Sequence, residues 1–344
     1  MKKLHNISLL RLLACIGVFC FHYFSVLTQF DTKVYMPSPF FVFIFAFVSA
    51  FLYSKKNIDD PKKWLGKNLL KLLVPMVVYV VTASLLLIIV GLIRYQGSFA
   101  DTFAGFVGTN PSDGQPNFVF GNLWFLGILA VCYLFTPILS KIANKNFSKK
   151  SFFVLALVAV ITVCLVETCF NFFCPVFTVY TISYFLGRVF YNKVLNEKVI
   201  LLPIISFAVL AIAASIWYIW VGKIPYVYAD IHIRVLRHVL EFFIAIPFSF
   251  FFLYTMRFIN KFNLWFLKYT DKYSFPFYMT HQLFLVGTLS FYELIPSWYF
   301  VPVVVLSVIN SILIVLLTDV MFMMIEKIKN RKKEEPQEVP PANQ

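Results

Sequence analysis

Two ionisable side chains, Arg11 and His22, stand at the two ends of the otherwise apolar stretch RLLACIGVFCFH near the N-terminus. They are eleven residues apart, which in an α-helix of about 100° per residue amounts to three turns plus about 20°. Both side chains therefore share one helix face and lie about 16 Å apart along the axis. A permanent cation could hold an anionic ligand at one end, and an imidazole could accept a proton at the other.

An extended acyl-CoA fits this separation. Its anionic nucleotide would seek the cation, and its pantetheine arm is about as long as the distance between the two side chains. His22 would then act as general base on an acceptor hydroxyl, while Arg11 would anchor the CoA or pair with a buried carboxylate. Two other interpretations stay open: Arg11 could extend to lipid head groups, and His22 could hydrogen-bond a neighbouring helix.

The elements that position these residues must be membrane helices, because 60% of the 344 residues are hydrophobic and only 13% are charged. Soluble domains are about 45–50% apolar and about 25% charged. The sequence predicts an all-α polytopic membrane protein with about ten transmembrane helices, since ten apolar segments approach the length that crosses a bilayer. These segments are approximately 7–29, 38–54, 69–93, 119–141, 151–170, 174–192, 198–221, 234–256, 274–292 and 298–325.

The distribution of lysine and arginine predicts the orientation of these spans. With the N-terminus placed inside, 24 of the 30 basic residues fall in inner segments and five in outer ones. This asymmetry predicts cytoplasmic N- and C-termini. The expected location is the cell membrane, namely the cytoplasmic membrane of a bacterium. It also accounts for the net charge of +14 without a nucleic-acid partner, and membrane lipid is the expected surrounding.

Further segments resemble the acyltransferase family 3 membrane proteins, and they occur in the family's order. The Arg-X10-His pattern of the first span is followed by FVFIFAFVSAFLYSKK, WLGKNLLKLLVP, GNLWFLGILAVCYLFTP, YFLGRVF, KYSFPFYMTHQLFL and MIEKIKN. Two positions depart from the pattern, because Ala50 replaces a glycine and Phe275 replaces a tyrosine. The resemblance covers residues 7 to about 327.

This resemblance implies an integral membrane O-acyltransferase. Such proteins move an acyl group, most often acetyl, from cytoplasmic acyl-CoA to a hydroxyl of a cell-envelope or exported carbohydrate. The donor substrate would be acetyl-CoA or another acyl-CoA, no metal is expected, and proteins of a glycan assembly pathway are possible partners. Residues 1–327 would form the ten-helix membrane acyltransferase domain, and residues 328–344 a charged, Pro-rich, disordered cytoplasmic tail.

Several residues besides Arg11 are candidates for holding the acyl-CoA. Two lysines spaced i and i+4 would meet the phosphates, although they could also be ordinary inner-surface lysines. Three polar residues spaced i, i+4 and i+7 would line a cavity, unless they only bond neighbouring helices. Together with an arginine at the end of the sixth span, which could instead serve the interface, the candidates are Lys67, Lys71, Arg188, Ser274, Tyr278 and His281.

A polar cluster at an outer boundary could bind the carbohydrate, helped by nearby aromatic residues. Local pairing at a solvated helix start is the alternative interpretation, as is structural packing for the tryptophan of the fourth span. The acceptor candidates are Trp124, Asp230, His232, His238 and Glu241. Asp319 is expected to partner a buried cation, and Glu326 a lysine.

Other functions and mechanisms stay open at this stage. Ten spans would also suit a transporter or flippase for a polysaccharide or lipid-linked sugar. Such a protein is expected to have two repeated halves, and the sequence does not show them. A non-catalytic accessory subunit is a third reading. The sequence also does not decide whether the acyl group is transferred directly or through a covalent acyl-enzyme. It likewise leaves open whether Cys169 and Cys174 form a disulfide or are small buried hydrophobic residues.

Overall fold

The computed structural model describes residues 4–27, 38–94, 107–109, 116–118, 120–144, 175–195, 201–221, 231–262, 264–285, 289 and 300–334. Almost all of these residues are helical. The α-helices are α1 (His5–Leu27), α2 (Ser38–Tyr53), α3 (Pro61–Arg94), α5 (Trp124–Asn144), α7 (Pro175–Leu195), α8 (Leu201–Ile216), α9 (Ile231–Thr255), α10 (Phe266–Leu285) and α11 (Phe300–Glu334). Short helical turns extend three of them: η1 (Gly121–Leu123), η2 (Trp217–Val221) and η4 (Met256–Lys261).

Six helical segments of the described residues are long and apolar enough to cross a membrane, and α2 is a shorter apolar helix. The structure therefore confirms an all-helical protein of the multi-pass membrane class. Helices cover nine of the ten predicted spans, while the segment 151–170 lies outside the described residues, as do Cys169 and Cys174. The count of ten spans and the cytoplasmic termini stay predictions.

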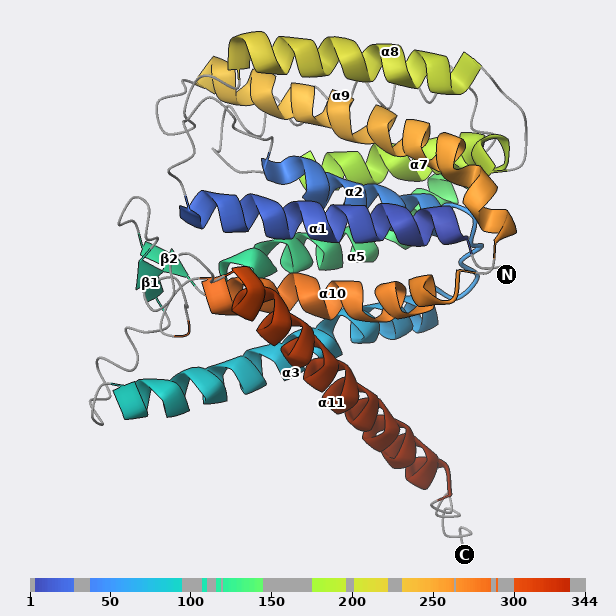
Figure 1. The fold of residues 1–344 in the computed structure, drawn as a ribbon. Helices are drawn as coiled ribbons and strands as arrows, with labels where there is room; N and C mark the ends of the chain where they lie inside the picture. The colour runs from blue at the N-terminus through green and yellow to red at the C-terminus, as the bar shows by residue number, and fades with distance from the viewer. Residues whose placement is uncertain are drawn as a thin grey trace, which may run out of the picture.

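Most helices lie side by side, and α11 crosses them obliquely and runs out of the bundle (Figure 1). Helix α2 is central, because it packs against α1, α7 and α9. Its residues Phe43, Phe47 and Phe51 have no exposed surface. On the other side of α1 lies α10, which also contacts α3 and α11.

The approach of α2 to α7 depends on a glycine. A Cβ on Gly187 would lie 2.5 Å from Ser54 Oγ and 3.1 Å from the Cα atom of Phe51. The Phe-Leu-Gly-Arg segment thus brings two backbones close together. A Cβ on Gly17 would likewise overlap the ring of Phe41, where α1 meets α2.

Two helices are much longer than a bilayer requires. Helix α3 has 34 residues and begins at Pro61, where Asp60 caps it by accepting a hydrogen bond of 3.0 Å from the Lys63 amide. Proline is well suited to a first helical position, and aspartate to the cap. The basic stretch before the third span is therefore helical.

Helix α11 has 35 residues and continues to Glu334. The prediction of a disordered tail from residue 328 is wrong for residues 328–334, since that charged stretch consists mostly of good helix formers and extends the preceding helix. Residues 335–344 lie outside the described residues.

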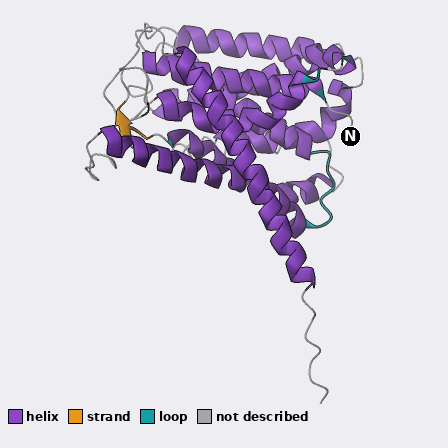
Figure 2. Cartoon of the chain, turned by 60° about the horizontal axis from the view of Figure 1, so that its bottom comes forward, coloured by secondary structure: helices purple, strands orange, loops and turns teal. Residues whose placement is uncertain are grey.

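A short hairpin interrupts the helical pattern. Strands β1 (Val107–Thr109) and β2 (Pro116–Phe118) pair antiparallel, with Gly108 opposite Asn117. They lie at one edge of the molecule (Figure 2). The hairpin lies between α3 and α5 in the chain.

Candidate active site

Helices α1 and α10 run parallel, side by side, and present their polar residues to one another. Arg11 of α1 meets Asp271 of α10, and His22, eleven residues later, meets His281, ten residues after Asp271. The predicted shared face of Arg11 and His22 is thus the face that α1 turns towards α10.

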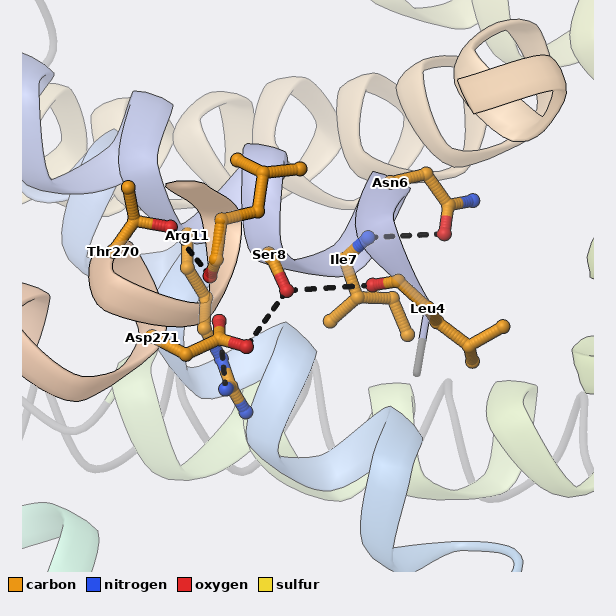
Figure 3. A network of polar contacts seen from close by, with 8 residues as sticks. Leu4, Asn6, Ile7, Ser8, Arg11, Thr270 and Asp271 are labelled. Atoms are coloured by element: carbon orange, nitrogen blue, oxygen red, sulfur yellow. Dashed lines mark hydrogen bonds and ion pairs between the residues drawn. The ribbon is translucent and has the colours of Figure 1, made fainter. Parts of the chain in front are cut away.

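Arg11 and Asp271 form an ion pair at the end where both helices begin. The Arg11 Nη1 and Asp271 Oδ1 atoms are 3.6 Å apart, and the two side chains are 31% and 24% exposed. Ser8 donates a hydrogen bond of 2.8 Å to the other Asp271 oxygen (Figure 3). The carboxylate is therefore held from α1, while its contact with the guanidinium is longer than a hydrogen bond.

The two histidine rings lie at the other end of this face. Their centroids are 5.2 Å apart with an interplanar angle of 41°. His281 has no exposed surface, and its Nδ1 lies 3.3 Å from the carbonyl oxygen of Phe277. The ring of Phe19 packs edge-on against it at 6.1 Å.

Ser274 and Tyr278 are both buried on the same stretch of α10. The Ser274 carbonyl accepts a hydrogen bond of 3.3 Å from the thiol of Cys15, which ties α10 to α1. The Tyr278 hydroxyl donates a hydrogen bond of 2.7 Å to the carbonyl of Asn122, and its ring centroid is 5.9 Å from that of His281. The Tyr278 contact matches the interpretation in which these side chains bond neighbouring helices, whereas the Ser274 contact is made by its backbone.

Asn122, which the sequence reasoning did not select, fastens the start of α5 to α10. Its side-chain amide donates to the carbonyls of Tyr278 at 2.8 Å and Met279 at 2.9 Å, and its backbone amide donates to Gln282 Oε1 at 2.9 Å. The sequence feature that could have indicated this role is the Gly-Asn-Leu-Trp segment, in which a polar asparagine stands directly before an apolar helix.

A cluster of lysines lies where α3 begins. Lys67 and Lys71 are both exposed on α3. Lys56, which follows α2, lies 5.0 Å from the centroid of the Tyr53 ring. Burial lowers the pKa of Lys56, and the neighbouring charges of Lys71 and Lys67 lower the pKa further. The three ammonium groups are therefore close enough to repel one another and to act together on an anion.

An aromatic cluster connects these lysines to Arg11. The ring centroids of Tyr53 and Trp64 are 5.1 Å apart, and those of Tyr53 and Tyr133 are 5.3 Å apart. The Arg11 guanidinium lies close enough to act electrostatically on both tyrosines. Arg11 and the lysines thus form one basic region at this end of the bundle.

Arg188 has protein partners at the same end. Its Nη1 donates a hydrogen bond of 3.1 Å to the carbonyl of Ser54, at the end of α2, and its Nη2 donates to the side chain of Asn144, at the end of α5. The guanidinium thus caps one helix and connects it to another. These contacts favour a structural role for Arg188 over direct binding of CoA.

The structure describes the side chains of three acceptor candidates, Trp124, His238 and Glu241. Trp124 is 43% exposed at the start of α5. His238 Nδ1 lies 3.2 Å from Glu241 Oε2, and both side chains are buried. His238 and Glu241 therefore pair locally, as the alternative interpretation proposed, but the pair lies inside the protein and not at a solvated helix start. Asp230 and the side chain of His232 lie outside the described part of the chain.

Two acidic residues of α11 complete the set of candidates. Asp319 accepts a hydrogen bond of 3.0 Å from Lys272 of α10, so it partners a cation as expected, although both side chains are about half exposed. Glu326 is exposed. In the described residues, no group of three or more metal-ligating side chains occurs.

Comparison with known proteins gives one match. The family described as an acyltransferase domain, of the acyltransferase 3 type, matches residues 4–316, which is most of the chain. No curated protein and no solved structure matches the chain.

Proposed function

The chain belongs to the acyltransferase 3 family, and on that premise we propose that this membrane acyltransferase moves an acetyl group from cytoplasmic acetyl-CoA to a hydroxyl of a cell-envelope or exported carbohydrate. One observation carries the proposal. A permanent cation and an imidazole, Arg11 and His22, lie at the two ends of the face that α1 turns towards α10, and both have ionisable partners there.

In this proposal the basic region receives the nucleotide part of the donor. Arg11, Lys56, Lys67 and Lys71 attract its phosphates, and the pantetheine arm extends along α1 towards His22. A cluster of lysines acts on phosphates as point charges, whereas a guanidinium can engage two oxygens at once.

The reaction then requires one proton acceptor. The hydroxyl oxygen of the acceptor attacks the thioester carbonyl carbon while His22 takes the hydroxyl proton. The bond between carbon and sulfur breaks, the ester forms, and His22 returns the proton to the departing thiolate of CoA. His22 thus ends the cycle neutral, with acetyl ester and CoA thiol as products.

The direction of the helices supports the orientation that this reaction needs. If ten spans are present, α1 is the first span and α10 the ninth, so both must cross in the same direction, and they run parallel. Helix α11 runs antiparallel to α10, since Thr280 bonds Ser311 at 3.1 Å and Lys272 bonds Asp319. A cytoplasmic N-terminus in the cell membrane then places the basic region on the side that holds acetyl-CoA.

The test is transfer of radiolabelled acetyl from acetyl-CoA in membranes that contain the protein, combined with mass spectrometry of O-acetyl groups on envelope glycans. We expect His22→Ala and Arg11→Ala to abolish acetylation. Ile16→Ala, which changes an exposed apolar residue of the same helix, serves as the matched control and should leave acetylation unchanged.

Unchanged acetylation in both variants would refute the proposal. A variant that acetylates the glycan but does not export it would instead favour the transporter function.

A further inference from the structure

We propose that His281 is a positioning residue that accepts a hydrogen bond from one ring nitrogen of His22 and leaves the other nitrogen free to take the hydroxyl proton. This inference rests on the proposed function of His22. It assigns the second histidine to the orientation of the base rather than to binding of the donor.

The first step is the tautomer of His281. Its Nδ1 lies 3.3 Å from the carbonyl oxygen of Phe277, and a carbonyl can only accept a hydrogen bond. The hydrogen of the neutral ring is therefore on Nδ1, and Nε2 carries a lone pair.

The second step is the environment of that lone pair. His281 has no exposed surface, and its Nε2 has no hydrogen-bond partner among the described residues. An unpaired acceptor in the interior is costly, and such atoms are rare in folded proteins. A buried acceptor of this kind points to a donor that engages it during function.

The third step is the choice of donor. The ring of Phe19 and that of Phe277, which is stacked at 6.4 Å, offer no polar atom. The hydroxyl of Tyr278 already donates to the Asn122 carbonyl. His22 remains among the described ring neighbours, with a centroid separation of 5.2 Å. No hydrogen bond joins the two rings in this structure. A ring nitrogen lies roughly 1 Å from its centroid, so turning the His22 ring until one nitrogen faces Nε2 brings the two atoms to about a hydrogen-bond length at this separation.

The pair has a direct consequence for the reaction. When His22 takes the hydroxyl proton it becomes an imidazolium, and the lone pair of His281 stabilises that charge through the same hydrogen bond. The proton stays on His22 until the thiolate of CoA takes it, and His281 does not change protonation state. Among the described residues, Tyr278 on α10 is a titratable ring neighbour of His281. The ring of Phe19, which packs on His281, also contacts Tyr23 of α1 and Phe300 of α11.

The test measures the titration of His22 directly. Carbethoxylation of His22 by diethyl pyrocarbonate, followed by mass spectrometry across pH, gives its apparent pKa in nanodiscs without any acceptor. His281→Phe keeps a ring for packing but removes the lone pair, whereas the side-chain oxygen of His281→Gln can still accept.

We expect His281→Phe to lower the apparent pKa of His22 by about one unit, because a hydrogen bond to the charged form raises it. His281→Gln should stay within a few tenths of a unit. In the acetyl-transfer assay, His281→Phe should lower kcat about 100-fold and leave the KM for acetyl-CoA within twofold. His281→Gln should recover kcat to within tenfold of the native value. If His281→Phe does not fold, His281→Met supplies a second variant without the ring nitrogen.

An unchanged His22 titration in the phenylalanine and methionine variants would overturn the inference. A raised KM with an unchanged kcat would do the same, and it would return His281 to the donor site. Failure of the proposed function would give a different result from failure of this inference. In that case His22→Ala would leave acetylation intact, whatever the titration of His22 shows.

Discussion

Replacing Asp271 by asparagine separates the two roles that Arg11 can have, namely binding CoA or only holding helices together. The asparagine side chain keeps the size of the aspartate and can still accept the hydrogen bond from Ser8, so the variant removes little except the negative charge. If Arg11 binds a phosphate of the donor, the carboxylate competes with that phosphate. The variant should then bind acetyl-CoA more tightly.

The geometry sets the size of the effect. At 3.6 Å two unit charges attract one another by about 4–5 kcal/mol at an effective dielectric constant of ~20. Both side chains are about a quarter to a third exposed, and water screening reduces such pairs to about 1 kcal/mol or less. The KM for acetyl-CoA should therefore fall by up to about fivefold, with kcat unchanged.

The assay is the initial rate of acetyl transfer as a function of acetyl-CoA concentration, together with the thermal stability of each variant. Asp319→Asn is the matched control, because it also removes a carboxylate that meets α10, and its ion pair is with Lys272, which is not part of the proposed donor site. It should leave the KM unchanged. A lower melting temperature for Asp271→Asn with an unchanged or higher KM would show that Arg11 serves only the structure.

Three further substitutions test contacts between helices. Gly187→Ala should destabilise the protein by about 1–3 kcal/mol, because the added Cβ would lie 2.5 Å from Ser54 Oγ. Thermal unfolding followed by intrinsic fluorescence measures this loss of stability, and a variant as stable as the native protein would contradict the close packing of α2 on α7. Arg188→Gln should lower the melting temperature while the KM for acetyl-CoA stays within twofold, whereas a large rise in KM would make Arg188 a donor ligand. Asn122→Ala should cost about 1–3 kcal/mol, because the carbonyl of Tyr278 loses a buried donor, and a melting temperature equal to that of the native protein would refute this.

The features that the sequence predicted well depend on local pattern. The shared face of Arg11 and His22 follows from helical periodicity within one element, and the helical spans follow from runs of apolar residues. The extension of α11 to Glu334 was missed because a charged composition was read as disorder, although lysine, arginine and glutamate are also good helix formers.

The partners of the site residues depend on long-range packing, which periodicity does not report. Asp271 lies before the predicted ninth span, 274–292, and nothing within α10 itself shows that it faces Arg11. The pairing of His238 with Glu241 was visible as a spacing of three, but its burial depends on the helices that cover it.

The parallel pairing of α1 with α10 also has a consequence for the synthesis of the protein. Cys15 and Ser274, which bond across this pair, are 259 residues apart. At roughly 5–20 residues per second, α1 waits on the order of 10–50 s in the membrane before its neighbour emerges from the ribosome. During that interval Arg11 has no carboxylate from α10 beside it and His22 no second imidazole. A chain that stops before α10 would thus hold most of its helices in the bilayer without the proposed site, so the proposed acyl transfer would begin only when translation is nearly complete.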